Sequence, residues 1–181
     1  YLRIAIRDFS MGVDLEVVTD EISSLSKSIV DVVYKTIFSF SEEEELGNKQ
    51  CVIAFGKLGA MELNYSSDID ITFVLTDVNI ESDEKTRLQK LNQAFIRALS
   101  IPGKNGFLFR IDTNLRPHGR QGALMGTLKH YKNYYESEAL GWELQIWLKA
   151  LPVTGNLEAG QGLIDEILDL TLNPEKKQWI R

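Results

Sequence analysis

Cysteine and histidine are both scarce in this sequence. Cys51 is the single cysteine among 181 residues, so no disulfide can form within the chain. Because Cys51 begins an apolar stretch, we expect it to pack in the core rather than to act in redox chemistry or bind a metal. The two histidines, His118 and His130, are far apart in the sequence and form no zinc-binding motif. We expect His130 to lie in a helix without a partner, which argues against a proton shuttle that uses His118.

Long apolar runs are also missing. No stretch approaches the length of about 20 apolar residues that spans a bilayer, and no signal-peptide pattern opens the chain. We therefore expect a cytoplasmic protein that has no membrane partner. Internal repeats and low-complexity tracts are absent as well. The composition, 44% apolar and 25% charged residues, is typical of a globular protein that can bury a core.

Positive charge is in deficit. Lys and Arg number 20 against 26 Asp and Glu, which gives a formal net charge of -6. A surface with this balance is poorly suited to neutralising many nucleic-acid phosphates, so we expect a protein or small-molecule substrate and no nucleic-acid partner. The chain opens at Tyr1 without a Met and closes at Arg181 without a polar tail, and we expect it to be a fragment of a longer protein.

Helical periodicity is clearest near the start of the chain. Apolar residues recur at intervals of three and four from Leu15 to Phe40 with no Pro or Gly between them, which predicts one long amphipathic helix. Residues 1–8 suit a helix end, and we expect the acidic run at 42–45 to be a solvated connector. Shorter helices are predicted at 60–63, at 84–99, twice within 128–149, and after Gly155.

Two predicted strands in the middle of the chain are joined by a polar segment. The first, 52–55, breaks at a glycine turn, 56–59, and the second, 69–75, carries Asp68 and Asp70 at its start. Alternate residues of a strand share a face, so we expect both carboxylates to point the same way while the apolar residues face the core. A glycine turn lets backbone N–H groups approach a phosphate without a Cβ in the way. The pattern therefore predicts a site for metal ions and a nucleotide.

A further predicted strand would add a third carboxylate. Residues 107–112 read as a strand that ends in Asp112, with its apolar side chains on the opposite face. If this strand pairs with the predicted strand at 69–75, Asp112 joins Asp68 and Asp70. Three carboxylates would then surround two divalent cations, either Mg²⁺ or Mn²⁺. An in-line nucleotidyl transfer uses such ions to lower the pKa of the attacking group and to neutralise charge on the phosphates.

Two blocks of the sequence resemble a known family. Residues 56–73 read G-K-L-G-A-M-E-L-N-Y-S-S-D-I-D-I-T-F, similar to the G-K-L-G-G-x-E-L-N-x-x-S-D-x-D-L-x-F block of glutamate–ammonia-ligase adenylyltransferases. These are bifunctional enzymes that adenylylate and deadenylylate glutamine synthetase, in the nucleotidyltransferase superfamily that includes DNA polymerase β. Residues 112–117, D-T-N-L-R-P, are similar to the family's D-x-R-L-R-P block, with Asn114 where an Arg is usual.

The resemblance implies a fold and a division of the chain. The fold would be α+β and of the DNA polymerase β type, with a small mixed sheet flanked by helices, a long helix before the sheet and helices after it. The chain would divide into an amino-terminal helical segment (1–46), a nucleotidyltransferase core (47–155) and the start of a following helical domain (156–181).

The predicted site assigns roles to particular residues. Asp68, Asp70 and Asp112 would bind the ions and act in catalysis, and Asp112 would also orient or deprotonate the nucleophile. The nucleotide would contact the glycine turn and two residues outside it, and the expected nucleotide-binding residues are Gly56, Lys57, Gly59, Ser67 and Arg116. Arg116 would also stabilise charge in the transition state.

The family implies the reaction and the partners. AMP would pass from ATP to a tyrosine of glutamine synthetase, or phosphate would remove that AMP as ADP. Residues 134–150 resemble the Y-Y-x-x-x-G-x-x-W-E-x-x-x-x-x-K-A-R block of the amino-terminal half of these enzymes, although Leu151 replaces the Arg. This half is the one linked to deadenylylation, so the resemblance favours removal of AMP. In the full-length enzyme a PII-type regulatory protein would be a further partner.

Two other functions stay open. A nucleic-acid nucleotidyltransferase of the same fold is disfavoured by the acidic net charge and by the block Glu62-Leu63-Asn64. A nucleotide-sensing regulatory module with a degenerate site is disfavoured because all three acids are present. A glycosyltransferase with its own Asp-x-Asp motif lacks support, because the glycine turn stands in the wrong context for one.

Overall fold

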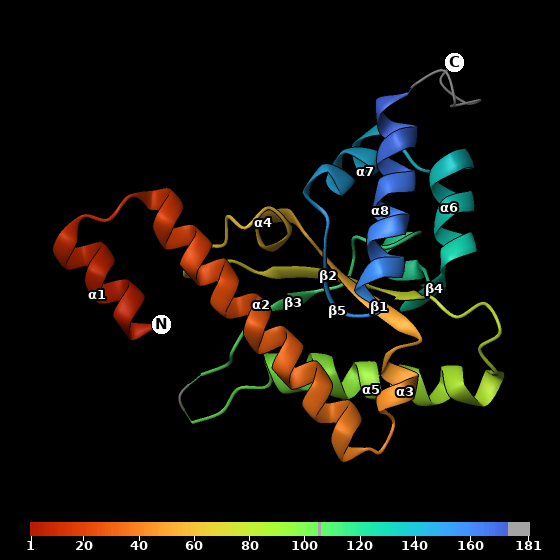
Figure 1. The fold of residues 1–181 in the computed structure, drawn as a ribbon, viewed down its shortest axis with the longest axis horizontal. Coiled ribbons are helices and arrows are strands. Elements are labelled where there is room, and N and C mark those ends of the chain that lie inside the picture. The colour runs from red at the N-terminus through yellow and green to blue at the C-terminus, as the bar shows by residue number, and fades with distance from the viewer. Residues whose placement is uncertain (105, 174–181) are drawn as a thin grey trace.

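The computed structural model describes residues 1–104 and 106–173, and it contains a small mixed β-sheet with helices on both faces (Figure 1). The helices are α1 (Leu2–Met11), α2 (Leu15–Phe40), α3 (Glu44–Gly47), α4 (Gly56–Gly59), α5 (Ser82–Ser100), α6 (Leu128–Ser137), α7 (Gly141–Gln145) and α8 (Leu157–Leu172). Two 3₁₀ turns are η1 (Gly119–Gln121) and η2 (Ile146–Lys149). The strands are β1 (Gln50–Phe55), β2 (Ile69–Leu75), β3 (Ile111–Asp112), β4 (Met125–Thr127) and β5 (Leu151–Gly155).

Strand β2 organises the sheet. It pairs antiparallel with β1 on one edge, and β1 in turn pairs antiparallel with β5. On the other edge β2 pairs parallel with two short strands, β3 beside residues 69–70 and β4 beside residues 73–75. The sheet is therefore mixed, as expected, and its parallel pairs lie on the β2 edge that contains Asp70.

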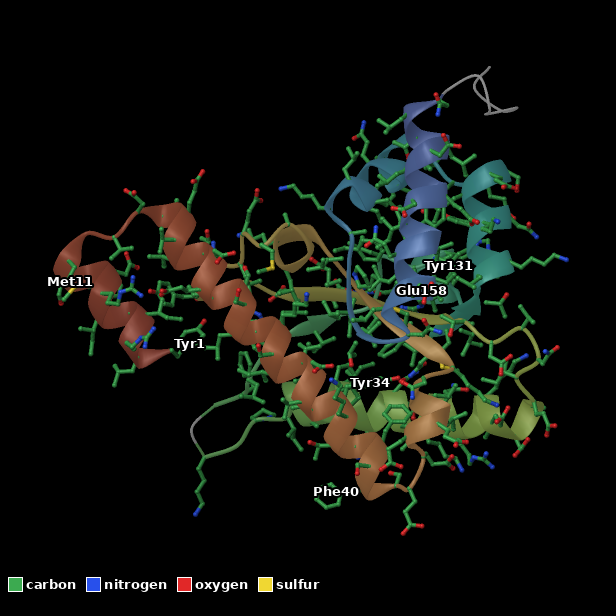
Figure 2. All side chains as sticks on the ribbon, in the orientation of Figure 1. Tyr1, Met11, Tyr34, Phe40, Tyr131 and Glu158 are labelled. Carbon is green, nitrogen blue, oxygen red and sulfur yellow. The ribbon has the colours of Figure 1, made fainter. Side chains whose placement is uncertain are left out.

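Alternating side chains of β1 enter two separate cores. Val52 and Ala54 pack with α2 and α5, whereas Cys51, Ile53 and Phe55 pack with α6, α7 and α8. Figure 2 shows the labelled Tyr34 and Tyr131 on opposite sides of the sheet, one in each core. The prediction that Cys51 packs in the core is confirmed, since it is fully buried, and burial raises the pKa of its thiol to about 12. That thiol is protonated at neutral pH and so is a poor nucleophile or metal ligand.

The first core also contains a buried polar network. The Gln50 side-chain amide donates to the Tyr34 hydroxyl at 2.9 Å and to Asn92 Oδ1 at 2.8 Å, and Asn92 returns a hydrogen bond to Gln50 Oε1 at 2.9 Å. Tyr34 donates in turn to the carbonyl of Gly47 at 2.8 Å. These bonds join α2, α3, β1 and α5 and satisfy polar groups that would otherwise be costly to bury.

The long helix is confirmed, whereas the acidic connector is only partly as predicted. Helix α2 spans the full interval from Leu15 to Phe40, where apolar residues recur every three or four positions. The acidic run at 42–45 is not all connector, because α3 begins at Glu44. Leu46 is buried in the core, and this packing stabilises the short helix that includes the end of the acidic run.

Two other predicted elements are corrected. The helix expected at 60–63 is wrong, because the helical turn covers Gly56–Gly59 and Met61 then adopts a left-handed φ of 58°, which does not continue a right-handed helix. The strand expected at 107–112 is reduced to its last two residues. Phe107 and Leu108 are 50% and 54% exposed, and the Phe109 N–H bonds the Leu99 carbonyl at the end of α5 (2.9 Å) instead of a strand.

Strands β4 and β5 were not indicated by the sequence pattern. Pro152 and Gly155 normally interrupt a strand, but β5 is the edge strand beside β1, where a missing N–H is tolerated. The last predicted helix is present as α8, while residues 174–181 of the expected 156–181 segment lie outside the described residues. No helix in residues 1–104 and 106–173 is both long and apolar enough to cross a bilayer.

Candidate active site

Asp70 and Asp112 lie side by side on neighbouring strands. The two residues are Cα partners in the parallel pairing of β2 with β3, and residues in register on adjacent parallel strands project from the same face. Adjacent strands are separated by about 4.8 Å, which brings the two carboxyl groups within reach of one ion. The pairing on which the predicted third carboxylate depended is therefore present for Ile111 and Asp112.

Gly56 closes the other side of Asp70. The register of β1 and β2 sets Phe55 opposite Asp70, so the chain leaves β1 directly beside this carboxylate. Gly56 has a φ of +57°, and a Cβ built on it would lie 2.8 Å from Asp70 Oδ2. The left-handed backbone favours glycine here, and a Cβ would have to displace the Asp70 carboxylate. Gly56 of the predicted glycine turn thus lies directly beside the predicted ligand Asp70.

Burial and like charge both act on the Asp70 carboxyl. Burial, followed by the nearby charges of Asp112 and then Asp68, together raise the pKa of Asp70 to about 6. Three carboxylates that repel one another in a half-buried setting favour a compensating cation. Their ligand atoms are all oxygens, the type that Mg²⁺ and Mn²⁺ prefer, so the donor set fits a hard divalent ion.

Asp68 and Asp112 each have a partner that fixes their orientation. Asp68 Oδ1 accepts a hydrogen bond from Arg110 Nε in an ion pair, and a terminal nitrogen of the same guanidinium donates to the Ser66 carbonyl at 2.9 Å. Asp112 Oδ1 accepts from the backbone N–H of Asn114 at 2.7 Å. Within residues 1–104 and 106–173, no three His, Cys, Asp or Glu side chains are grouped so that they could already hold a metal ion. As the side chains stand, Asp68 is engaged by Arg110.

Comparison with known proteins identifies the family. The family model for glutamate-ammonia ligase adenylyltransferase matches residues 1–164. The chain belongs to this family. It is 36% identical over 179 residues to the "bifunctional glutamine synthetase adenylyltransferase/adenylyl-removing enzyme" of Hahella chejuensis, across 91% of this chain and 19% of that protein.

Two further relatives in the family have the same name. The protein from Bifidobacterium longum subsp. infantis is 36% identical over 157 residues, across 80% of this chain and 14% of its own length. The protein from Cutibacterium acnes is 33% identical over 172 residues, across 92% of this chain and 17% of its own length. The chain thus spans between 14% and 19% of the length of these three relatives.

The five residues predicted to bind the nucleotide have different surroundings. Gly56 adjoins Asp70, Lys57 is exposed on α4, and Ser67 is half-buried directly before Asp68. Gly59 has a packing role, because a Cβ on it would lie only 1.9 Å from the Lys149 carbonyl oxygen. Contact with a nucleotide stays a prediction for all five.

Arg116, the fifth of these residues, supports the loop between β3 and β4. Its guanidinium donates to the carbonyl of Thr113 and, at 3.2 Å, to that of Gly122. These bonds tie the two ends of the loop that follows Asp112. The structure thus gives Arg116 an immediate role in loop conformation, and its predicted role in stabilising the transition state stays untested.

Two residues near the site have partners that the sequence did not reveal. Arg110 was predicted only as a residue on the Asp112 face, and its ion pair with Asp68 joins positions 42 apart in the chain. The expectation that His130 has no partner is wrong, because its ring centroid lies 6.0 Å from that of His118. His118 also lies 4.8 Å, centroid to centroid, from Tyr134 on α6. These contacts join the loop that contains His118 to helix α6, and local sequence periodicity does not predict them.

Proposed function

We propose that this chain is a cation-dependent nucleotidyltransferase module that transfers AMP to or from a tyrosine of glutamine synthetase. The observation that supports it best is the in-register pair of Asp70 and Asp112 on adjacent parallel strands, in a chain that belongs to the adenylyltransferase family. The relatives are named as glutamine synthetase adenylyltransferases and adenylyl-removing enzymes, which supports glutamine synthetase as the substrate.

The proposed chemistry is an in-line displacement at the α-phosphorus. In the forward direction the tyrosine oxygen bonds to the α-phosphorus of ATP, the bond to pyrophosphate breaks, and the phenolic proton leaves to a base. In the removal reaction a phosphate oxygen bonds to the α-phosphorus of the tyrosine-linked AMP, and the bond from that phosphorus to the tyrosine oxygen breaks. The tyrosine oxygen takes up a proton, and ADP is released. Asp68, Asp70 and Asp112 would hold divalent cations, which neutralise phosphate charge and lower the pKa of the nucleophile. Asp112, oriented by the Asn114 N–H, would position the attacking group.

Several finer assignments belong to the same proposal. The fold is assigned to the DNA polymerase β type, with residues 47–155 as the catalytic core, residues 1–46 packed on it and residues 156–181 as the start of a helical domain. Removal of AMP by phosphate is favoured over its addition because of the block at residues 134–150. The full-length protein would act in the cytoplasm and respond to a PII-type regulatory protein. Mg²⁺ is the preferred ion, with Mn²⁺ as a substitute.

The test uses both forms of the substrate. The chain is incubated with Mg²⁺ and either unmodified glutamine synthetase and ATP, or adenylylated glutamine synthetase and phosphate, and the intact mass of the substrate is followed. We expect AMP to be lost from the adenylylated form, with ADP as the product. Asp70→Asn should lower the rate at least about 100-fold, as expected when an electrostatic contribution to the transition state is removed. Asp165→Asn, an exposed site on α8, is the matched control and should leave the rate unchanged.

Two outcomes contradict this proposal. One is an unchanged mass of glutamine synthetase in both reactions, although the chain is folded by circular dichroism. The other is wild-type turnover by Asp70→Asn, which would remove this carboxylate from the chemistry.

A further inference from the structure

Within residues 1–104 and 106–173, Asp68 is the one predicted cation ligand whose carboxylate forms an ion pair with a basic side chain. Arg110 approaches from the residue position two before Asp112, and its Nε contacts Asp68 Oδ1. A second nitrogen of the same guanidinium donates to the carbonyl of Ser66, which precedes Asp68 by two residues in the chain. Because a guanidinium is planar, these two bonds fix the direction of approach as well as the distance.

The two contacts link Asp68, through Arg110, to the loop before β2. Asp68 itself lies just outside β2, and its side chain is 52% exposed, so the strand does not fix its orientation as it does for Asp70. Asp70 and Asp112, by contrast, are held by the parallel pairing of β2 and β3. The difference is consistent with the finding that, in residues 1–104 and 106–173, no three His, Cys, Asp or Glu side chains are grouped so that they could hold a metal ion.

An arginine beside a metal ligand can act in two opposite ways. As an outer partner it orients the ligand, and its loss weakens metal binding about 10- to 100-fold. As a competitor it occupies the carboxylate itself, and its positive charge also repels an arriving cation, so that its loss strengthens metal binding. The direct bond from Arg110 Nε to Asp68 Oδ1 occupies an oxygen that would otherwise be available to a cation, which favours the second role.

We propose that Arg110 is a positioning residue that competes with the divalent cation for Asp68 and so sets the affinity of the site. This inference rests on the proposed function, since it requires that the carboxylates bind a cation. Arg110 holds Asp68 away from Asp70 and Asp112 until the cation displaces the guanidinium. Full assembly of the site then depends on the exchange of one ionic partner of Asp68 for another.

The surroundings of Arg110 allow this exchange. Its side chain is 60% exposed, and it lines a cavity of about 130 Å³ together with Tyr65, Ser66 and Phe107. The guanidinium can therefore turn away from Asp68 into the cavity or solvent without disturbing the core. An ion pair this exposed is worth at most about a fivefold change in an equilibrium, which a divalent cation on several carboxylates can overcome.

The experiment measures Mn²⁺ binding by the purified chain, without nucleotide or protein substrate. Free Mn²⁺ is followed by electron paramagnetic resonance, and the Mn²⁺-induced rise in melting temperature serves as an independent readout. Arg110→Ala is expected to bind Mn²⁺ about two- to fivefold more tightly than the wild type, with a correspondingly larger rise in melting temperature. Arg120→Ala removes the same charge from an exposed position in the loop after β3 and is expected to leave the affinity unchanged.

Each result decides between the alternatives. Weaker or unchanged Mn²⁺ binding by Arg110→Ala overturns the competitor role, and so does equal tightening by Arg110→Ala and Arg120→Ala, which would reflect general charge alone. If the wild type binds no Mn²⁺ at all, both this inference and the proposed cation site fail. If the wild type binds Mn²⁺ and Asp70→Asn does not, the cation site stands and the Arg110 result is judged by itself.

Discussion

The two ends of β2 differ in burial and in charge. From Ile71 to Leu75 every side chain is buried, because one face of the strand packs under α2 and α5 and the other under α6. At the start of the strand, Asp70 is only half-buried and lies beside Asp112 and Gly56. Burial of apolar groups stabilises the fold at one end, while like charges crowd together at the other. The packing of the buried end therefore keeps Asp70 and Asp112 close together, although their like charges would otherwise separate them.

Substitution of Phe73 tests whether the buried end of β2 stabilises the fold. Its side chain is fully buried and packs edge-on against Phe95 of α5, with ring centroids 6.1 Å apart. Phe73→Ala should lower the free energy of unfolding by about 3 to 5 kcal/mol, because it removes apolar contacts and leaves a cavity. Urea denaturation followed by circular dichroism measures this change.

The matched control is Phe40→Ala at the end of α2. Phe40 is 88% exposed, so its truncation should change the free energy of unfolding by less than about 0.5 kcal/mol. Figure 2 shows the labelled Phe40 projecting away from the fold. Equal losses in the two variants would contradict the view that the buried end of β2 supplies the stability.

Gly56 tests the acidic end. Gly56 and Gly12 both have a left-handed φ, but a Cβ on Gly12 would meet no atom within 4 Å, whereas one on Gly56 would lie 2.8 Å from Asp70 Oδ2. Gly12→Ala should therefore cost only backbone strain, about 1 kcal/mol. Gly56→Ala should add a displacement of the Asp70 carboxylate and reduce adenylyl transfer by roughly 100-fold, as small misplacements at reacting groups do.

The two glycine variants are compared by urea denaturation and by the mass assay on glutamine synthetase. Similar losses of stability with a loss of activity only in Gly56→Ala would show that the close approach to Asp70 matters to the chemistry. Full activity in Gly56→Ala would mean that the carboxylate tolerates the extra methyl group.

The central part of the site could be predicted from sequence because it depends on local alternation. Asp70 lies near the start of a strand with a mostly apolar sequence. Asp112 ends a short strand that pairs with it, so that Asp112 lies in register with Asp70. The strand itself proved much shorter than predicted, since apolar residues alone do not show that Phe107 and Leu108 would stay exposed.

The remaining features depend on contacts between distant parts of the chain. The ion pair of Arg110 with Asp68 and the close packing of Gly59 on the Lys149 carbonyl both join segments that are far apart in sequence. Strand β5 was hidden because Pro152 signals a break unless the strand is known to lie at an edge. A single sequence contains no periodicity that reports such pairings, so the structure was needed to find them.

The smallest expected effect is the pH dependence that Asp70 gives to stability. The folded chain raises the pKa of this carboxyl to about 6 from an ordinary value of 3.8, through burial and then the charges of Asp112 and Asp68. Between these two values the folded chain binds more protons than the unfolded chain, so the stabilising contribution of protonated Asp70 is complete below about pH 4 and is lost as the pH rises through about 6. Because the group is half-exposed, screening should limit the loss to the order of 1 kcal/mol.

Asp70→Asn isolates this contribution, since its side chain does not titrate. Urea denaturation of both proteins without divalent cations at about pH 4 and about pH 7 should show that the variant gains on the wild type by the order of 1 kcal/mol as the pH rises. Other titrating groups act in both proteins and largely cancel in the difference. A constant difference between the two proteins across this range would mean that the acidic end of β2 imposes no electrostatic cost on the fold, and the contrast with its buried end would then be one of packing alone.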